Sequence, residues 1–326
     1  MYLEHNINIY SSLDIACFGD VIFDYDRFEN FETLSANRTG RTYKASLKDY
    51  DNPFILKTII LSNEFTLRDL ECQLIKRESL DCENILRFYG LTKTNLDTYM
   101  SVYEHANNGI LRCYLEQNYS TFDLNIILHL AKQLTNAIML LHNNNIVHGN
   151  LHSENIFVHD SSIKIGDFST SLMTSRTKSF SLLISHVQYI DTMYLSDPKT
   201  YTLNEKSDIY SLGILLWEIS SGSIPFESEM PIGFNLFNDI IHGKREKVIN
   251  KTPQKYSDIY KECWKHDAKE RPTIQSVNKM LDQIIIKEEP DVHKEKTRKI
   301  SYYTGKEKHI VKHTLSCYRD SQQLVL

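Results

Sequence analysis

The chain has 326 residues, of which 41% are hydrophobic, and a formal net charge of −5 without a long block of like charges. This size predicts one bipartite domain or two domains with a sizeable core, and the charge argues against nucleic acid as a partner. The N-terminus lacks the pattern of a signal peptide, no apolar run reaches the ~18 residues of a membrane span, and the six cysteines form no C-x-x-C pair, so we expect a reduced, cytoplasmic protein without a membrane partner.

The first part of the chain has the pattern of a small β-sheet with one helix. FENFETLSANRTGRTYKASL predicts two strands joined at Gly40, and FILKTIIL predicts a third strand rich in β-branched residues. FTLRDLECQLIKRESL has apolar residues at helical spacing, and ILRFYGLT and YMSVYEH follow as two more strands. Residues 28–104 are therefore expected to form a small, sheet-based lobe, preceded by an N-terminal extension over residues 1–27.

The second part of the chain is mainly helical, and we expect a larger lobe over residues 105–285. Helical spacing occurs in LNIILHLAKQLTNAIMLLHN, EKSDIYSLGILLWEIS, SDIYKECWKHD and TIQSVNKMLDQII. The second of these is apolar nearly all round, as in a helix at the centre of a lobe. Residues 286–326 carry nine Lys or Arg and six Asp or Glu with weak periodicity, which predicts a flexible tail or, alternatively, a docking element.

Several motifs occur in the order and spacing of a protein kinase. Lys57 ends the FILK strand, HGNLHSEN stands where kinases carry H-R-D-L-x-x-x-N, and Asp167-Phe168-Ser169 stands where they carry D-F-G. KSDIYSLGILLWEIS and DAKERPTI resemble the central and closing helices of the large lobe. The chain thus resembles the protein kinase superfamily over about residues 28–285. Its short motifs look most like those of the tyrosine-kinase-like serine/threonine kinases. The resemblance implies an α+β fold of two lobes, a small antiparallel sheet with one helix and a larger, mainly helical lobe.

The resemblance also implies ATP and Mg²⁺ as cofactors, because several residues of the phosphoryl-transfer machinery are present. Lys57 stands where the family holds the α- and β-phosphates, and Glu71 is its expected helix partner, with Asp69 as the alternative. Asn155 and Asp167 stand at the two Mg²⁺-ligand positions.

The catalytic loop departs from the family at its central positions. Asn150 replaces the catalytic Asp, and an amide has no useful basicity. General base catalysis typically contributes about 10²–10⁴-fold to the rate. Glu154 is the nearby acid and the alternative base, and Gly149 replaces the Arg that pairs with an activation-segment phosphate in the family.

The expected nucleotide site is also altered. In the phosphate-binding loop, two of the family's three glycines are replaced, and the positions are Ser35, Asn37 and Gly40. The residues expected around adenine are Thr42, Ile55 and Phe157, together with the backbone of Glu104 and Ala106 in the hinge. Because glycine lets backbone approach a phosphate, we expect a looser cradle, and the larger side chains predict a narrower adenine slot.

The family's A-P-E motif is changed as well. It stands here as Asp191-Thr192-Met193, so the glutamate that would pair with Arg271 is replaced by Met193. Arg271 is therefore expected to need another partner.

These observations favour a pseudokinase, a kinase-like signalling scaffold or allosteric regulator that acts on a protein partner in trans. The first alternative is a slow serine/threonine kinase that transfers the ATP γ-phosphate to protein hydroxyls, because metal ions, Lys57 and positioning supply much of the acceleration. The second is a structural module that binds no nucleotide.

Overall fold

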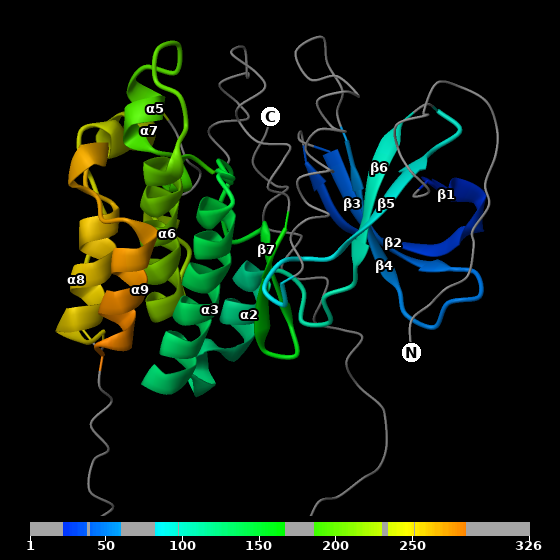
Figure 1. Ribbon diagram of the computed structural model, residues 1–326, viewed down its shortest axis with the longest axis horizontal. Coiled ribbons are helices and arrows are strands. Elements are labelled where there is room, and N and C mark those ends of the chain that lie inside the picture. The colour runs from blue at the N-terminus through cyan, green and yellow to red at the C-terminus, as the bar shows by residue number, and fades with distance from the viewer. Residues whose placement is uncertain are drawn as a thin grey trace, which may run out of the picture.

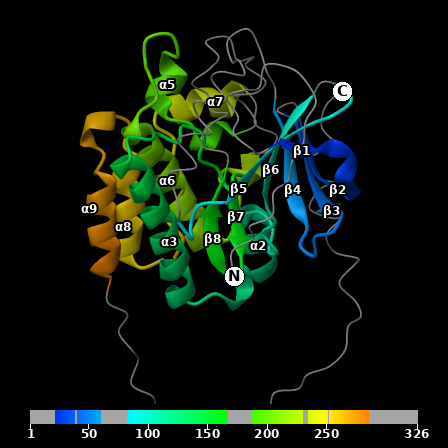
Figure 2. The ribbon, with the colours of Figure 1, turned by 45° about the vertical axis from the view of Figure 1, so that its right-hand side comes forward.

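In the computed structural model, the chain folds into two lobes (Figure 1). The structure describes residues 22–37, 40–59, 82–96, 98–166, 186–229, 234–250 and 252–284. The helix expected in FTLRDLECQLIKRESL and the Asp167-Phe168-Ser169 motif lie outside these residues. In Figures 1 and 2 the sheet lobe stands beside the helical lobe, and β7 lies on the side of the helical lobe that faces the sheet.

The smaller lobe contains a six-stranded sheet in the order β1-β5-β6-β4-β3-β2. The strands are β1 (Ile22–Asp24), β2 (Phe28–Asn37), β3 (Gly40–Leu47), β4 (Phe54–Thr58), β5 (Phe88–Lys93) and β6 (Tyr99–Glu104). The pairs are antiparallel except for β1 and β5, which are parallel. The five strands predicted from residue 28 onward are present, and β1 adds a strand before that boundary.

The larger lobe is built from helices and one small antiparallel sheet of β7 (Ile156–His159) and β8 (Ser162–Ile165). The helices are α2 (Leu111–Asn118), α3 (Leu124–Asn143), α5 (Thr192–Ser196), α6 (Glu205–Ser221), α7 (Phe234–Ile241), α8 (Gln254–Cys263) and α9 (Ile274–Asp282). Helix α6 packs against α3 and α8, and it is buried from Ser207 to its last residue. The central apolar helix expected from the sequence is therefore present.

Helix α3 has the length and mean hydropathy of a membrane-spanning segment. Its 20 residues include a window of mean hydropathy 1.3, so by length and composition alone it could cross a membrane. Polar residues such as His129 and Lys132 interrupt the helix, so no uninterrupted apolar run reaches ~18 residues. In the structure α3 packs against α6, α9 and β8, and its buried residues include Leu134 and Ile138, so it serves here as a core helix.

Helix α6 ends at Gly222, and we expect Gly222→Ala to be more destabilising than Gly109→Ala. The two glycines have φ of +69° and +72°, a conformation that costs other residues about 1 kcal/mol. A Cβ at Gly222 would also lie 2.2 Å from the Tyr119 ring, whereas a Cβ at Gly109 would meet no atom within 4 Å.

Urea denaturation should give a loss of unfolding free energy of about 1 kcal/mol for Gly109→Ala, and about 2–3 kcal/mol for Gly222→Ala because of the added steric conflict. Equal losses in the two variants would contradict a tight contact between Gly222 and Tyr119.

Candidate functional site

Asp208 of α6 anchors the loop between α3 and β7. Its carboxylate accepts hydrogen bonds from the backbone N–H groups of His148 and Gly149, both at 2.8 Å, and lies 2.9 Å from His142 Nε2. Because Asp208 is only 1% exposed, water competes little for these interactions. Gly149 has φ of +70°, which glycine adopts without strain. One buried carboxylate on α6 therefore fixes the loop backbone at His148 and Gly149.

We expect Asp208→Asn to lower the free energy of unfolding by about 1–3 kcal/mol, because an amide leaves one of the buried N–H donors without an acceptor. Urea denaturation measures the loss. Asp239→Asn is the matched control, because Asp239 pairs with Lys244 at 3.2 Å but its side chain is 50% exposed. This control is expected to lose no more than about 1 kcal/mol. Equal losses in both variants would contradict the anchoring role of Asp208.

Asn150 lies in this loop with its backbone held on both sides. Its N–H donates to His148 Nδ1 at 3.2 Å, and its carbonyl accepts from Asn155 Nδ2 at 2.9 Å. The loop's one carboxylate, Glu154, lies 3.8 Å from His186 Nε2, and its side chain is 44% exposed. The position of the family's base therefore carries an amide on a well-held backbone, and the nearby acid is close to a histidine.

Lys57 and Asn155 are brought together from the two lobes. The Lys57 Nζ on β4 donates to Asn155 Oδ1 at 3.3 Å, and Asn155 is 2% exposed. The Asn155 carbonyl also accepts from the Gly166 N–H at 2.9 Å. A residue predicted to hold phosphates thus contacts a residue predicted to hold a metal ion. Their expected companions Glu71 and Asp167 lie outside the described residues.

The strand register aligns the phosphate-loop region with Lys57. Ser35 of β2 is opposite Thr42 of β3, and Thr42 is in turn opposite Lys57 of β4. Asn37 and Gly40 form the last described pair of β2 and β3. The backbone of the predicted cradle therefore lies at one end of this hairpin, next to the strand that carries Lys57.

Three of the residues expected around adenine, Ile55, Ala106 and Phe157, belong to one apolar cluster. Its buried members are Ile55, Leu86, Tyr103, Ala106 and Phe157. A Cβ placed on Gly166 would lie 2.9 Å from the Phe157 ring, so the surroundings of this ring are tightly packed. The hinge residue Glu104 pairs with Lys164 Nζ at 3.0 Å and accepts from the Arg87 N–H at 2.7 Å, so its side chain is engaged within the protein.

Arg271 finds its partner within the altered triad. Its guanidinium donates to Asp191 Oδ1 at 2.7 Å, and neither side chain is exposed. The expectation that Arg271 needs a partner other than a glutamate at position 193 agrees with this contact. The carboxylate has moved to the first position of the triad, where Asp191 also caps α5 through the Met193 N–H at 3.0 Å.

We did not predict the buried polar network that lies beside the loop. Arg112 of α2 lies 2.8 Å from the Glu218 carboxylate and donates to Ser153 Oγ at 2.9 Å. The Tyr189 hydroxyl donates to Glu218 at 2.7 Å. Burial raises the pKa of Glu218, and the Arg112 charge opposes this shift. A glutamate inside the apolar α6 was the one sequence signal for this network, because a fully buried carboxylate requires a partner.

Comparisons with known proteins agree with this architecture. Residues 30–281 match the sequence model of the family described as protein tyrosine and serine/threonine kinase. A Dictyostelium discoideum protein named as a "probable LIM domain-containing serine/threonine-protein kinase" is 27% identical over 289 residues, covering 86% of this chain and 41% of that protein. A serine/threonine-protein kinase of Arabidopsis thaliana is 24% identical, covering 76% of this chain and 42% of that protein.

The tyrosine-protein kinase Abl of Drosophila melanogaster is 24% identical over 258 residues, covering 77% of this chain and 15% of that protein. The chain thus spans less than half the length of these relatives. The two-lobed α+β fold implied by the motifs is confirmed. Because the family model covers most of its length, the chain belongs to the protein tyrosine and serine/threonine kinase family.

Proposed function

We propose that the chain is a pseudokinase, a kinase-fold module that binds Mg-ATP and works as a signalling scaffold or allosteric regulator. The observation that carries the proposal is the amide of Asn150 at the position of the catalytic base, in a loop whose one carboxylate lies beside His186. Loss of a general base typically costs about 10²–10⁴-fold, or roughly 2.7–5.5 kcal/mol of activation barrier. Such a loss makes phosphoryl transfer too slow to be the module's main activity.

Nucleotide binding is supported by the contact between Lys57 and Asn155. An ammonium group and an amide oxygen 3.3 Å apart offer one donor for phosphate and one ligand for Mg²⁺. Asn155 and Asp167 would hold the metal ion, and Lys57 would hold the phosphates. Bound Mg²⁺ would neutralise phosphate charge, while the apolar cluster around Ile55 and Phe157 would accept the adenine ring.

A protein partner in trans follows from the same proposal. A module that transfers phosphate poorly acts through a surface whose shape or stability responds to the bound nucleotide. The partner would recognise the nucleotide-bound form, so nucleotide and partner would each strengthen the binding of the other.

A slow serine/threonine kinase is the second candidate, and the Lys57–Asn155 contact favours it. Positioning and charge neutralisation contribute much of the acceleration in phosphoryl transfer, so a chain without a base retains part of it. A structural module that binds no nucleotide is the third candidate, and the tight packing around Phe157 favours it.

Two measurements on the full chain separate the three candidates. The first is thermal stabilisation by Mg-ATP, and the second is transfer of radiolabelled γ-phosphate to a generic protein substrate. Both use wild type, Lys57→Met and, as a matched control, Lys132→Met on α3, whose side chain is 38% exposed. The pseudokinase predicts stabilisation that Lys57→Met alone removes, with transfer at background level.

The other outcomes favour the alternatives. Transfer at rates of about 1–100 s⁻¹, typical of kinases, and lost in Lys57→Met would overturn the pseudokinase proposal. Transfer that depends on Lys57 but stays far below those rates would favour the slow kinase. No stabilisation by Mg-ATP in any variant would favour the structural module.

A further inference from the structure

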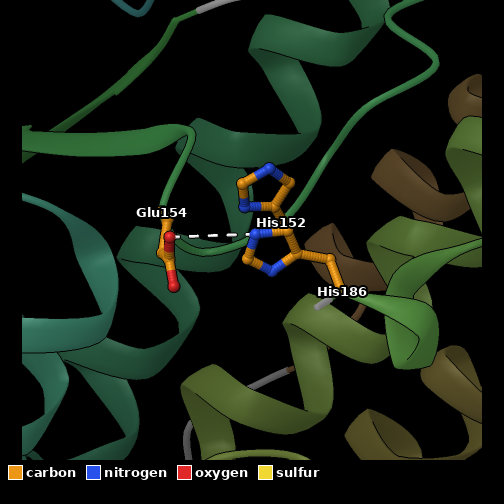
Figure 3. A group of neighbouring side chains, drawn as sticks. All are labelled: His152, Glu154 and His186. Carbon is orange, nitrogen blue, oxygen red and sulfur yellow. Dashed lines mark ion pairs between the residues drawn. The ribbon is translucent and has the colours of Figure 1, made fainter. Parts of the chain in front are cut away.

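Three donor side chains meet at the catalytic loop, and none of them was assigned to the nucleotide site. His152 and Glu154 come from the loop between α3 and β7, and His186 directly precedes the 3-10 turn Val187–Tyr189. One ligand atom from each residue lies within 4.8 Å of the other two. Figure 3 shows the two imidazole rings stacked, with the Glu154 carboxylate facing them.

We propose that His152, Glu154 and His186 form a binding site for one divalent transition-metal ion, with Zn²⁺ as the best fit. Two imidazole nitrogens and one carboxylate are a donor set that Zn²⁺ binds well, with a fourth position open to water or another ligand. Mg²⁺ prefers an all-oxygen, octahedral environment, so this donor set does not suit the metal of the nucleotide site.

The spacing of the donors is close to what such an ion needs. Zn–N and Zn–O bonds of about 2.0–2.2 Å place neighbouring donors of a tetrahedral ion roughly 3.3–3.5 Å apart. His186 Nε2 and Glu154 Oε2 are already 3.8 Å apart. The two rings stack at a centroid distance of 3.9 Å with an interplanar angle of 8°, so they must tilt toward each other to share an ion. Rotation about the Cβ–Cγ bond of histidine meets only a broad torsional potential, so the torsion itself opposes this adjustment weakly.

An unpartnered nitrogen points to a missing ligand. Within the described part of the chain, no group forms a hydrogen bond with the buried Nδ1 of His152, and the residue is only 6% exposed. Buried polar atoms in folded proteins nearly always have a partner, and an exception requires an explanation. A cation bound at this nitrogen would provide one.

Burial and nearby charges both act on the two rings. Burial lowers the pKa of His152 and of His186, although the Glu154 charge opposes the shift at His186. An imidazole in its neutral form offers a metal ion a lone pair. Two cationic side chains, Lys57 and Arg112, act electrostatically on the rings. Arg112 is balanced by Glu218 at 2.8 Å, and Lys57 donates to Asn155 Oδ1 at 3.3 Å.

The chain segments that carry the donors are fixed by one polar network. Ser153, between the two loop donors, accepts from Arg112 and lies 3.1 Å from the Tyr189 hydroxyl. Tyr189 follows His186 in the same turn, and its N–H donates to the His186 carbonyl at 3.0 Å. The network thus holds both segments in place, and a bound ion would cross-link the loop that contains Asn150 to the segment that carries His186 and Tyr189.

The test is metal titration of the full chain after chelator treatment. Isothermal titration with Zn²⁺ is expected to show one high-affinity site, and Co²⁺ at that site should give the visible absorption of a tetrahedral complex. Single variants His152→Ala, His186→Ala and Glu154→Gln are expected to weaken Zn²⁺ binding by more than about 10–100-fold, the range for mere supporting residues of metal sites. Excess Mg²⁺ should not compete.

His159→Ala is the matched control. His159 Nε2 lies 3.6 Å from Asp160 on the exposed β7–β8 turn, and the pair belongs to no described three-donor group. Its loss should leave the high-affinity site intact. Glu154→Gln replaces an exposed residue and tests the site even if the histidine variants fold poorly, which circular dichroism of the metal-free proteins would reveal. Zn²⁺ affinity that is equal in wild type, Glu154→Gln and His159→Ala, or absence of a tetrahedral Co²⁺ band in wild type, would overturn the proposal.

Discussion

Replacing Arg271 with alanine is expected to lower the free energy of unfolding by about 3–5 kcal/mol, the range for removing one partner of a buried ion pair. The guanidinium lies 2.7 Å from Asp191, and both side chains are fully buried. Without Arg271, the carboxylate would keep only neutral side-chain donors, the hydroxyls of Ser207 at 2.8 Å and Tyr201 at 3.0 Å. A charge left in the core without a counter-charge makes the loss large.

Arg271 also connects several segments of the helical lobe, which adds to the expected effect. Its Nε donates to the Lys265 carbonyl at 2.8 Å, and its Nη atoms donate to the carbonyls of Lys206 at 2.8 Å and His266 at 2.9 Å. These carbonyls belong to chain segments around α6 and between α8 and α9. Alanine would leave all of them without this donor.

Urea denaturation of Arg271→Ala, with a surface ion pair as control, checks the prediction. Lys132 and Asp282 lie 2.9 Å apart, but their side chains are 38% and 63% exposed, so Lys132→Ala should cost no more than about 1 kcal/mol. The Asp191→Ala/Arg271→Ala double variant should lose less than the sum of the single variants, because no unpaired charge remains. Additive losses, or a loss for Arg271→Ala as small as for Lys132→Ala, would show that the pair is not coupled as the structure indicates.

Periodicity predicted most of the described fold. The strands from β2 to β6 and the helices α3, α6, α8 and α9 fall where their apolar patterns placed them. Helices α3, α8 and α9 bury one apolar face, whereas α6 is buried nearly all round. Strand β1 was missed, since its three residues are too few to show a period. The membrane-like hydropathy of α3 was missed because the polar residues of an amphipathic helix interrupt any apolar run.

The candidate site was predicted only where a motif fixes the position of a residue. Lys57 and Asn155 were each assigned a role through their motifs, and the structure brings them into contact although they are 98 residues apart. Asp191 was noticed as an altered motif residue but was not recognised as the partner of Arg271, because the contact depends on how the chain turns before α5. His152 and His186 belong to no spacing pattern, so only the folded chain places their rings together.

Asn150→Asp is expected to raise the rate of γ-phosphate transfer by about 10²–10⁴-fold, the contribution of a general base. The backbone of Asn150 is held through His148 and Asn155, so an aspartate of nearly the same shape would place its carboxylate where the amide is now. Its neighbour Gly149 keeps its left-handed conformation, so the substitution adds no backbone strain. The new charge is partly exposed to solvent, because residue 150 is not fully buried.

The gain in transfer rate should depend on Lys57 and on the position of the new carboxylate. Lys57→Met in the Asn150→Asp background is expected to abolish the transfer, because the phosphates then lose their cation. Asn125→Asp, at the exposed start of α3, adds the same charge away from the loop and should leave transfer at background level. A gain that survives Lys57→Met would indicate a contaminating kinase. A chain that binds Mg-ATP but gains nothing from Asn150→Asp would show that its inactivity comes from the altered phosphate cradle rather than from the missing base.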